Sequence, residues 1–285
     1  MLVQLLLLLL LRALRTRGQC TSLLQTSKLH LTSIPCSIHQ TGLTNDSEAK
    51  WVETWIQKNP QCQHKLWKDE EVEKFVQQNS DQLLWPIWPG LTHVERADVF
   101  RYLVLWKEGG YYADANVECM KPIDEWGIPN EATMIAGYEF GHRLPEEDRK
   151  LFQFARTEQF EQWFLASAPG NPVLLRCMEL VRQRYSWKLQ DTLQLSGAGV
   201  WSDAVHEFLA RTVPEVLEKE VAFRSNKSEL LRKDTRGVPS ERLYGPDASG
   251  GFMWVAAAGR VNPEAHVEQW DPTEGKEALV YRHTK

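Results

Sequence analysis

The stretch from Glu95 to Asp124 reads ERADVFRYLVLWKEGGYYADANVECMKPID and is the most informative part of the sequence. Its first half is rich in apolar residues and predicts a helix that ends at Gly109, because glycine commonly terminates helices. A short aromatic strand follows the double glycine and carries Asp114 and Asn116 toward its end. Because side chains alternate along a strand, we expect these two residues on the same face.

This pair of oxygen-bearing side chains predicts a cation site. Two such oxygens on one face can hold a hard divalent cation, which can in turn bind a diphosphate. Asp114 offers a carboxylate, whereas Asn116 offers only a neutral amide oxygen. The missing charge predicts a weaker metal affinity. The structural alternative for Asp114 is a strand-end aspartate that caps a turn.

Several motifs of the chain resemble the DXD-containing glycosyltransferases of family 32, which include the fungal α-1,6-mannosyltransferases that initiate N-glycan outer chains. The family pattern is R-A-D-x-x-R-Y, an apolar run, G-G-x-Y-x-D-x-D and then Pro-hydrophobic-Asp. This sequence supplies the pattern between Arg96 and Asp124, except that Asn116 replaces the second acid. The segment 196–201 is similar to the family's T-G-P-x-V-W/F turn, and the similarity covers about residues 33–210.

Alternating strand and helix signals predict an α/β fold with a mainly parallel sheet flanked by helices. Strands are expected at 33–39, 65–67, 111–114 and 133–137. Helices are expected from 46 onward and at 70–78, 92–107, 158–168, 172–185 and 202–212, with Thr92 and Glu95 as a capping box. The resemblance implies a GT-A type, Rossmann-like nucleotide-sugar domain over residues 28–285. In such sheets ligands bind beyond the carboxyl ends of the strands.

Asp98 and Arg101 lie three residues apart, and therefore on one face of the predicted helix. In the family, an aspartate and an arginine at this spacing contact hydroxyls of the donor sugar. A carboxylate can accept two hydroxyl hydrogen bonds, and a guanidinium can donate to sugar or phosphate oxygens. An ion pair on a solvated helix face is the structural alternative. Together with Asp114, these residues form the predicted catalytic set.

The resemblance implies further binding residues. Those implied to contact the donor are His39, Gln40, Thr41, Arg96, Gly197, Gly199 and Trp270. Those implied to hold the cation, Mn²⁺ or Mg²⁺, are Asp114, Asn116 and His266. Structural alternatives stay open for several of them: residues 39–41 could simply end a strand, the glycines could lead into a helix, and His266 could be a surface histidine.

The resemblance implies metal-dependent transfer of a hexose with retention, first of all mannose from GDP-mannose to a glycan acceptor in the secretory pathway. Family members also transfer mannose to inositol phosphoceramide, or galactose from UDP-galactose to glycolipids, so a glycolipid acceptor is an alternative. A third interpretation is a catalytically degenerate scaffold subunit in a lumenal complex, for which Asn116 is the evidence.

The net charge and the N-terminal segment indicate which kinds of partner to expect. The net charge of −5 argues against nucleic-acid binding, which favours a basic stripe. Residues 1–27 contain a leucine-rich run of about ten residues, shorter than the roughly 20 that a spanning helix needs. A signal peptide, a weak Golgi membrane anchor and a misassigned start codon all stay open for this segment. The four cysteines that follow it allow three pairings: Cys36, Cys62, Cys119 and Cys177.

Overall fold

The computed structural model describes residues 33–42, 46–126, 128, 130, 132–137, 149–150, 154–212, 252–256 and 280–282. All of them lie in one compact unit that spans Leu31–Lys285. Within these described ranges, no helix has the length and apolar character needed to cross a membrane.

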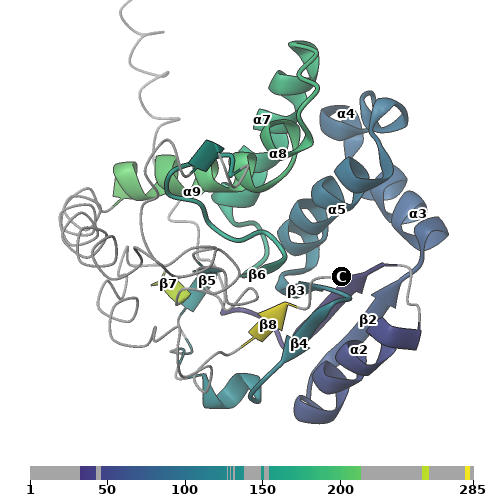
Figure 1. Cartoon of the computed structure of the whole chain (residues 1–285), viewed down its shortest axis with the longest axis vertical. Coiled ribbons are helices and arrows are strands. Elements are labelled where there is room, and N and C mark those ends of the chain that lie inside the picture. The colour runs from purple at the N-terminus through teal and green to yellow at the C-terminus, as the bar shows by residue number, and fades with distance from the viewer. Residues whose placement is uncertain are drawn as a thin grey trace, which may run out of the picture. The chain divides into compact units, whose positions relative to one another are not determined.

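A six-stranded sheet in the order β2-β1-β3-β6-β5-β7 forms the centre of this unit (Figure 1). Its strands are β1 (Ser37–Thr41), β2 (Gln63–Trp67), β3 (Gly110–Asp114), β5 (Ala132–Gly137), β6 (Phe164–Ser167) and β7 (Phe252–Ala256). β1 pairs in parallel with β2 and β3, while β6 is antiparallel to β3 and β5, and β7 is antiparallel to β5. Four of the six described strands therefore point the same way, which confirms the predicted α/β fold, and β6 and β7 make the sheet mixed.

Helices cover both faces of this sheet (Figure 1). They are α2 (Asp46–Lys58), α3 (Asp69–Asn79), α4 (Asp81–Leu84), α5 (His93–Glu108), α7 (Pro172–Ser186), α8 (Thr192–Leu195) and α9 (Ala198–Thr212), with 3-10 turns η2 (Trp88–Gly90) and η3 (Ile123–Glu125). A short ribbon of β4 (Val117–Cys119) and β8 (Val280–Arg282) pairs separately.

Alternation along β3 divides the hydrophobic core in two. Tyr112 joins the core that α5, α7 and α9 form on one face of the sheet. Tyr111 and Ala113 join a second core on the other face, together with Trp55 of α2. This alternation is the period-2 pattern of a strand buried on both sides. It also directs the next residue of the Tyr112 face, Asp114, toward α5.

The junction between α5 and β3 forms as predicted at both ends of the helix. Thr92 accepts a hydrogen bond from the Glu95 amide, and the Glu95 carboxylate accepts one from the Thr92 amide, which confirms the capping box. Gly109 ends the helix with a φ of 69°. Gly110 follows with a φ of 101°, and a Cβ there would lie 2.3 Å from the Ser37 carbonyl oxygen. A side chain at residue 110 would therefore collide with the backbone of β1.

The helix predicted at 158–168 is wrong. Residues Phe164–Ser167 instead form β6, which pairs with β3 on one side and β5 on the other. All four residues of the strand are buried, so the segment has no solvent face of the kind that an amphipathic helix needs. Pairing between two strands overrides the local preference here.

The cysteines form one disulfide in the described part of the chain. Cys36 and Cys62 are bonded, which joins the segments that enter β1 and β2. Cys119 and Cys177 are free thiols in the protein interior.

Candidate functional site

The carboxyl ends of β1 and β3 meet at one edge of the sheet. Their parallel pairing places Thr41 opposite Asp114. The Thr41 hydroxyl lies 2.5 Å from the Tyr112 hydroxyl, which donates to Asp114 Oδ1 at 3.1 Å. Because Tyr112 and Asp114 are two residues apart in the strand, they share the face that α5 covers. A chain of hydroxyl groups thus orients the Asp114 carboxylate.

Asp98 and Arg101 of α5 complete this arrangement from the helix side. Both side chains are buried, with 4% and 6% of the residue surface exposed, so the pair does not lie on a solvated helix face. The Arg101 NH2 nitrogen lies 3.2 Å from Asp98 Oδ1 and 3.3 Å from Asp114 Oδ1. The structure therefore brings the three predicted catalytic residues together around one guanidinium group.

The Arg101 guanidinium has further partners that fix its orientation. Its NH1 group donates to the Gln162 carbonyl oxygen at 2.6 Å. Its central carbon lies 4.8 Å from the centre of the Tyr112 ring, in a cation–π contact. Tyr112 thus contacts Arg101 through its ring and Asp114 through its hydroxyl group.

Three residues outside the predicted set support Asp98 and Arg101. The Ser196 hydroxyl donates to Asp98 Oδ2 at 2.8 Å. The Tyr102 hydroxyl donates to the Ser196 carbonyl at 2.9 Å and accepts from the Gln162 side-chain amide at 2.5 Å. Tyr102 and Ser196 lie inside the motifs that carry the family resemblance, so the sequence itself offered a reason to include them in the site. Gln162 lies in the segment wrongly predicted as a helix, and no motif of the sequence pointed to it.

Burial and charge set the protonation of this network. Burial raises the pKa of Asp98 to about 6, against the opposing effects of the Arg101 charge and the Ser196 hydrogen bond. Burial alone would lower the pKa of Arg101, but the neighbouring Asp114 and Asp98 carboxylates hold it above its ordinary value. Arg101 therefore stays a buried cation. Burial also raises the pKa of Tyr112, which keeps its hydroxyl a neutral donor.

Asp114 suits a hard cation in its donor chemistry. Its side chain is 24% exposed, and its Oδ1 atom contacts Tyr112 and Arg101. Its Oδ2 atom has no hydrogen-bond partner among the described residues. Sites for Mg²⁺ commonly use one or two carboxylates and complete the coordination with substrate phosphates and water.

Asn116 and His266 are the other two predicted cation ligands. β3 ends at Asp114, and the next two residues form the turn into β4, so the strand alternation used to place Asn116 does not reach that residue. His266 lies outside the described residues. Within the described ranges, no group of three or more His, Cys, Asp or Glu side chains could hold a metal ion. Cation binding by Asp114, Asn116 and His266 stays a prediction.

His39 and Gln40 connect β1 to its neighbours. The Trp67 indole N–H donates to His39 Nδ1 at 3.2 Å, so the ring proton lies on Nε2, 3.1 Å from the Gly109 carbonyl oxygen. Burial lowers the pKa of His39 to about 4, so the ring is neutral. Gln40 donates to the Asp114 carbonyl oxygen at 3.4 Å. A contact of either residue with a donor stays a prediction.

The other residues predicted to bind the sugar nucleotide differ in how they relate to the Asp98–Arg101–Asp114 arrangement. The Gly197 carbonyl oxygen accepts from the Tyr102 hydroxyl at 3.3 Å, and Gly199 lies in the first turn of α9. Arg96 has other partners: it donates to the Pro89 carbonyl oxygen at 3.3 Å, and its central guanidinium carbon lies 5.5 Å from the centre of the Trp88 ring. Trp270 lies outside the described residues.

Comparison with known families identifies this region. Residues 45–133 match the family described as "Glycosyltransferase sugar-binding region containing DXD motif". The match contains the whole Asp98–Arg101–Asp114 arrangement. The resemblance predicted from the sequence is therefore confirmed: residues 45–133 match the sugar-binding region of the DXD-containing glycosyltransferases.

Two of the individual relatives are mannosyltransferases of a fission yeast. The chain is 32% identical over 182 residues to the initiation-specific alpha-1,6-mannosyltransferase of Schizosaccharomyces pombe, a match that covers 56% of this chain and 44% of the relative. It is 37% identical over 145 residues to inositol phosphoceramide mannosyltransferase 3 of the same yeast, covering 45% of this chain and 40% of the relative. The chain thus spans less than half the length of these two curated relatives.

One solved structure is also similar. The PaToxG glycosyltransferase superposes with a TM-score of 0.46 at 17% sequence identity, covering 81% of this chain and 90% of that one. The fold described above rests on the sheet topology and not on this similarity.

Proposed function

We propose that the protein transfers a hexose from a nucleotide sugar to a glycan acceptor with retention of configuration, and that mannose from GDP-mannose is the donor. One observation carries this proposal. A buried arginine stands between two carboxylates, Asp98 and Asp114, at the edge where the carboxyl ends of β1 and β3 meet. Open α/β sheets bind nucleotides at this edge.

In this proposal each residue has a separate task. Asp98 accepts hydrogen bonds from hydroxyls of the donor sugar and orients the ring. Arg101 places a fixed positive charge beside the departing nucleoside diphosphate, where negative charge grows during transfer. Burial makes this charge effective, because few water molecules screen it there.

Asp114 would hold a Mn²⁺ or Mg²⁺ ion together with Asn116, and His266 is a third proposed ligand. Such an ion supplies charge neutralisation at the diphosphate of the donor. The partly exposed side chain of Asp114 supports this assignment, and its Oδ1 contacts with Tyr112 and Arg101 keep the carboxylate in a defined orientation.

We place the protein in the lumen of the secretory pathway, most directly the Golgi, with residues 1–27 as a signal or membrane anchor and 28–285 as the transferase domain. The disulfide between Cys36 and Cys62 supports an oxidising compartment, because disulfides rarely persist in the cytosol.

A glycolipid acceptor is the second candidate. The relative named inositol phosphoceramide mannosyltransferase 3 is 37% identical over its matched segment, a higher identity than that of the initiation-specific enzyme. Both proposed activities use the same site for the sugar nucleotide and differ in the acceptor, which is a glycan in one and a glycolipid in the other.

The test is Mn²⁺-dependent turnover of a panel of sugar nucleotides by the purified full chain. Asp114→Asn should lower turnover by roughly 10²-fold or more, because a charge at the reacting diphosphate is lost. Its free energy of unfolding should fall by only about 1 kcal/mol, since the side chain is partly exposed and Asp98 still pairs with Arg101. Glu125→Gln, the same neutralisation at an exposed site, is the matched control.

Each outcome of the panel is informative. Turnover of GDP-mannose alone supports the proposal, and a mannoside or inositol phosphoceramide acceptor then separates the two candidates. Turnover of a UDP-sugar retains the transferase and replaces the donor. A folded protein that turns over no donor would contradict the proposed activity and favour the scaffold interpretation.

A further inference from the structure

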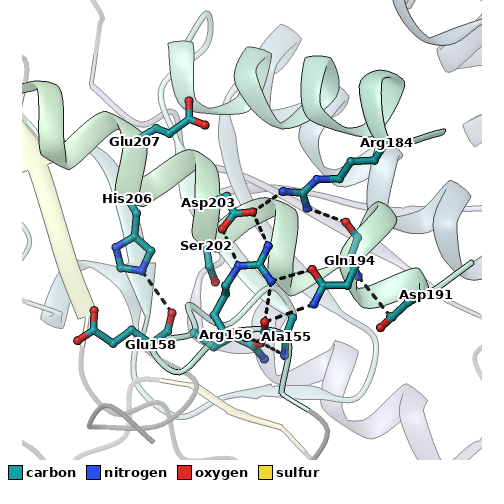
Figure 2. Close-up of polar contacts among 12 residues, drawn as sticks. Ala155, Arg156, Glu158, Arg184, Asp191, Gln194, Ser202, Asp203, His206 and Glu207 are labelled. Atoms are coloured by element: carbon teal, nitrogen blue, oxygen red, sulfur yellow. Dashed lines mark hydrogen bonds and ion pairs between the residues drawn. The ribbon is translucent and has the colours of Figure 1, made fainter. Parts of the chain in front are cut away.

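An ion-pair cluster joins α7, α8 and α9 to the segment that precedes β6 (Figure 2). We call Arg156, Arg184, Gln194 and Asp203 the α9 cluster. Arg156 binds the Asp203 carboxylate through two parallel hydrogen bonds, Nε to Oδ1 at 2.6 Å and NH2 to Oδ2 at 2.5 Å. Arg184 donates to the same Oδ2 atom. Two guanidinium groups thus converge on one carboxylate.

The cluster holds Gln194 by both its backbone and its side chain. Arg184 donates to the Gln194 carbonyl oxygen at 2.6 Å, and Arg156 donates to its side-chain oxygen at 2.7 Å. The Gln194 side-chain amide donates in turn to the Ala155 carbonyl oxygen at 3.3 Å. Figure 2 shows Gln194 enclosed between the two arginines. The position of α8 is therefore fixed relative to both α7 and α9.

Both chain segments fixed in this way lead directly to the site. Gln194 precedes by two residues Ser196, which is fully buried and donates to Asp98. Arg156 lies at the start of the segment that ends in Gln162, whose carbonyl oxygen accepts from Arg101. One cluster thus anchors a partner of each member of the Asp98–Arg101 pair.

We propose that Asp203 is a positioning residue for the Asp98–Arg101 pair, and that it acts through the segments carrying Ser196 and Gln162. Asp203 contacts neither member of the pair. The Asp203 side chain is 24% exposed. Because partly exposed ion pairs often add little net stability, orientation of these two segments is the role that the contacts support best. The expected effect on turnover depends on the proposed transferase function, whereas the expected effect on the structure does not.

The kinetic test is a double-mutant cycle between Asp203→Asn and Ser196→Ala. Asp203→Asn keeps the shape of the side chain and removes its charge, and we expect kcat/KM to fall roughly tenfold to a hundredfold, as displaced catalytic groups commonly cause. If Asp203 acts through Ser196, the double variant loses clearly less than the product of the two single losses. The proposal would be overturned if the double variant lost the full product of the two single losses in kcat/KM, or if Asp203→Asn were fully active.

Two further variants guard against a general loss of folding. Gln194→Leu removes the side-chain contacts with Arg156 and Ala155 and keeps the Arg184 hydrogen bond to the backbone of residue 194. It should reproduce part of the Asp203→Asn loss, and full activity would count against the proposal. Glu207→Gln is the matched control, because Glu207 lies on the same helix and pairs with Arg176 at 2.8 Å, outside the α9 cluster. It should retain wild-type turnover.

Amide hydrogen exchange supplies a readout that needs no activity. In full-length Asp203→Asn, exchange should accelerate in the segments 155–162 and 194–200 and stay unchanged in α2. Unchanged exchange in both segments would refute the positioning role. If the wild-type chain turned over no donor, the proposed function would fail, and the exchange result would still decide whether Asp203 positions Ser196 and Gln162.

Discussion

Tyr111 and Tyr112 are neighbours in β3 with opposite surroundings. The Tyr112 ring lies under Arg101, and its hydroxyl group connects Thr41 to Asp114. Tyr111 points into the other core, where burial raises its pKa to about 12, and its hydroxyl group has no hydrogen-bond partner in the described part of the chain. The two side chains therefore form a matched pair for testing one hydroxyl group.

Tyr112→Phe should lower kcat/KM by about tenfold, the usual effect of losing one hydrogen bond to a charged group. The ring remains in place, so the melting temperature should change little. Tyr111→Phe should leave kcat/KM unchanged. Steady-state kinetics on the donor that the panel identifies would measure both, and equal effects of the two substitutions would contradict the role assigned to Tyr112.

The sequence predicted those site residues whose placement follows from local geometry. Asp98 and Arg101 share a helix face because of their spacing, and Asp114 lies where a strand ends. Ser196 and Gln162 reach the site across 98 and 61 residues of sequence separation, respectively. Such contacts depend on the packing of α8 and β6, which periodicity within one segment does not encode.

At the scale of elements, the passage from α5 into β3 depends on the double glycine. Gly110 combines a left-handed backbone with a 2.3 Å approach of any Cβ to the Ser37 carbonyl oxygen. Gly170 has a similar φ of 73°, but a Cβ there would meet nothing within 4 Å. A substitution at Gly170 therefore tests the cost of the left-handed backbone alone, whereas one at Gly110 adds the collision with β1.

Gly170→Ala should reduce the free energy of unfolding by about 1–2 kcal/mol, the cost of a left-handed alanine. Gly110→Ala should reduce it by clearly more, because β1 must also move away from β3. Urea unfolding followed by circular dichroism measures both. Equal losses would show that β1 accommodates a methyl group at this position.

Element prediction succeeded where end signals and periodicity agreed. The capping box at Thr92 and the stop at Gly109 bounded α5 closely. The strand β6 was missed because its apolar run is short, and such a run looks alike in a buried strand and a buried helix. The antiparallel direction of β6 follows from its pairing with β3, to which no local signal points.

At the scale of the whole molecule, two buried groups give stability an opposing dependence on pH. The pKa of His39 is lowered from 6.5 to about 4, so the stability it contributes is present above pH 6.5 and is lost as the pH falls toward 4. The pKa of Asp98 is raised from 3.8 to about 6, so its contribution is present below pH 3.8 and is lost as the pH rises toward 6.

Between about pH 4 and 6 the two effects partly cancel in the wild-type protein. Of these two effects, Asp98→Asn keeps that of His39, which makes the free energy of unfolding rise with pH by up to about 1.4 kcal/mol per unit. Urea unfolding at half-unit steps would reveal this steeper slope. His39→Gln in the same background should flatten it, and identical slopes in the wild type and Asp98→Asn would contradict the opposing effects.

The His39 ring has a consequence for spectroscopy. Its two nitrogens are chemically distinct in a single neutral tautomer, because Trp67 donates to one and the other donates to the Gly109 carbonyl oxygen. Near neutral pH its two ¹⁵N resonances should therefore be far apart, unlike the averaged signals of a histidine that exchanges between forms. The separation of these two ¹⁵N resonances therefore reports whether β1, β2 and the end of α5 remain assembled when a ligand occupies the nearby edge of the sheet.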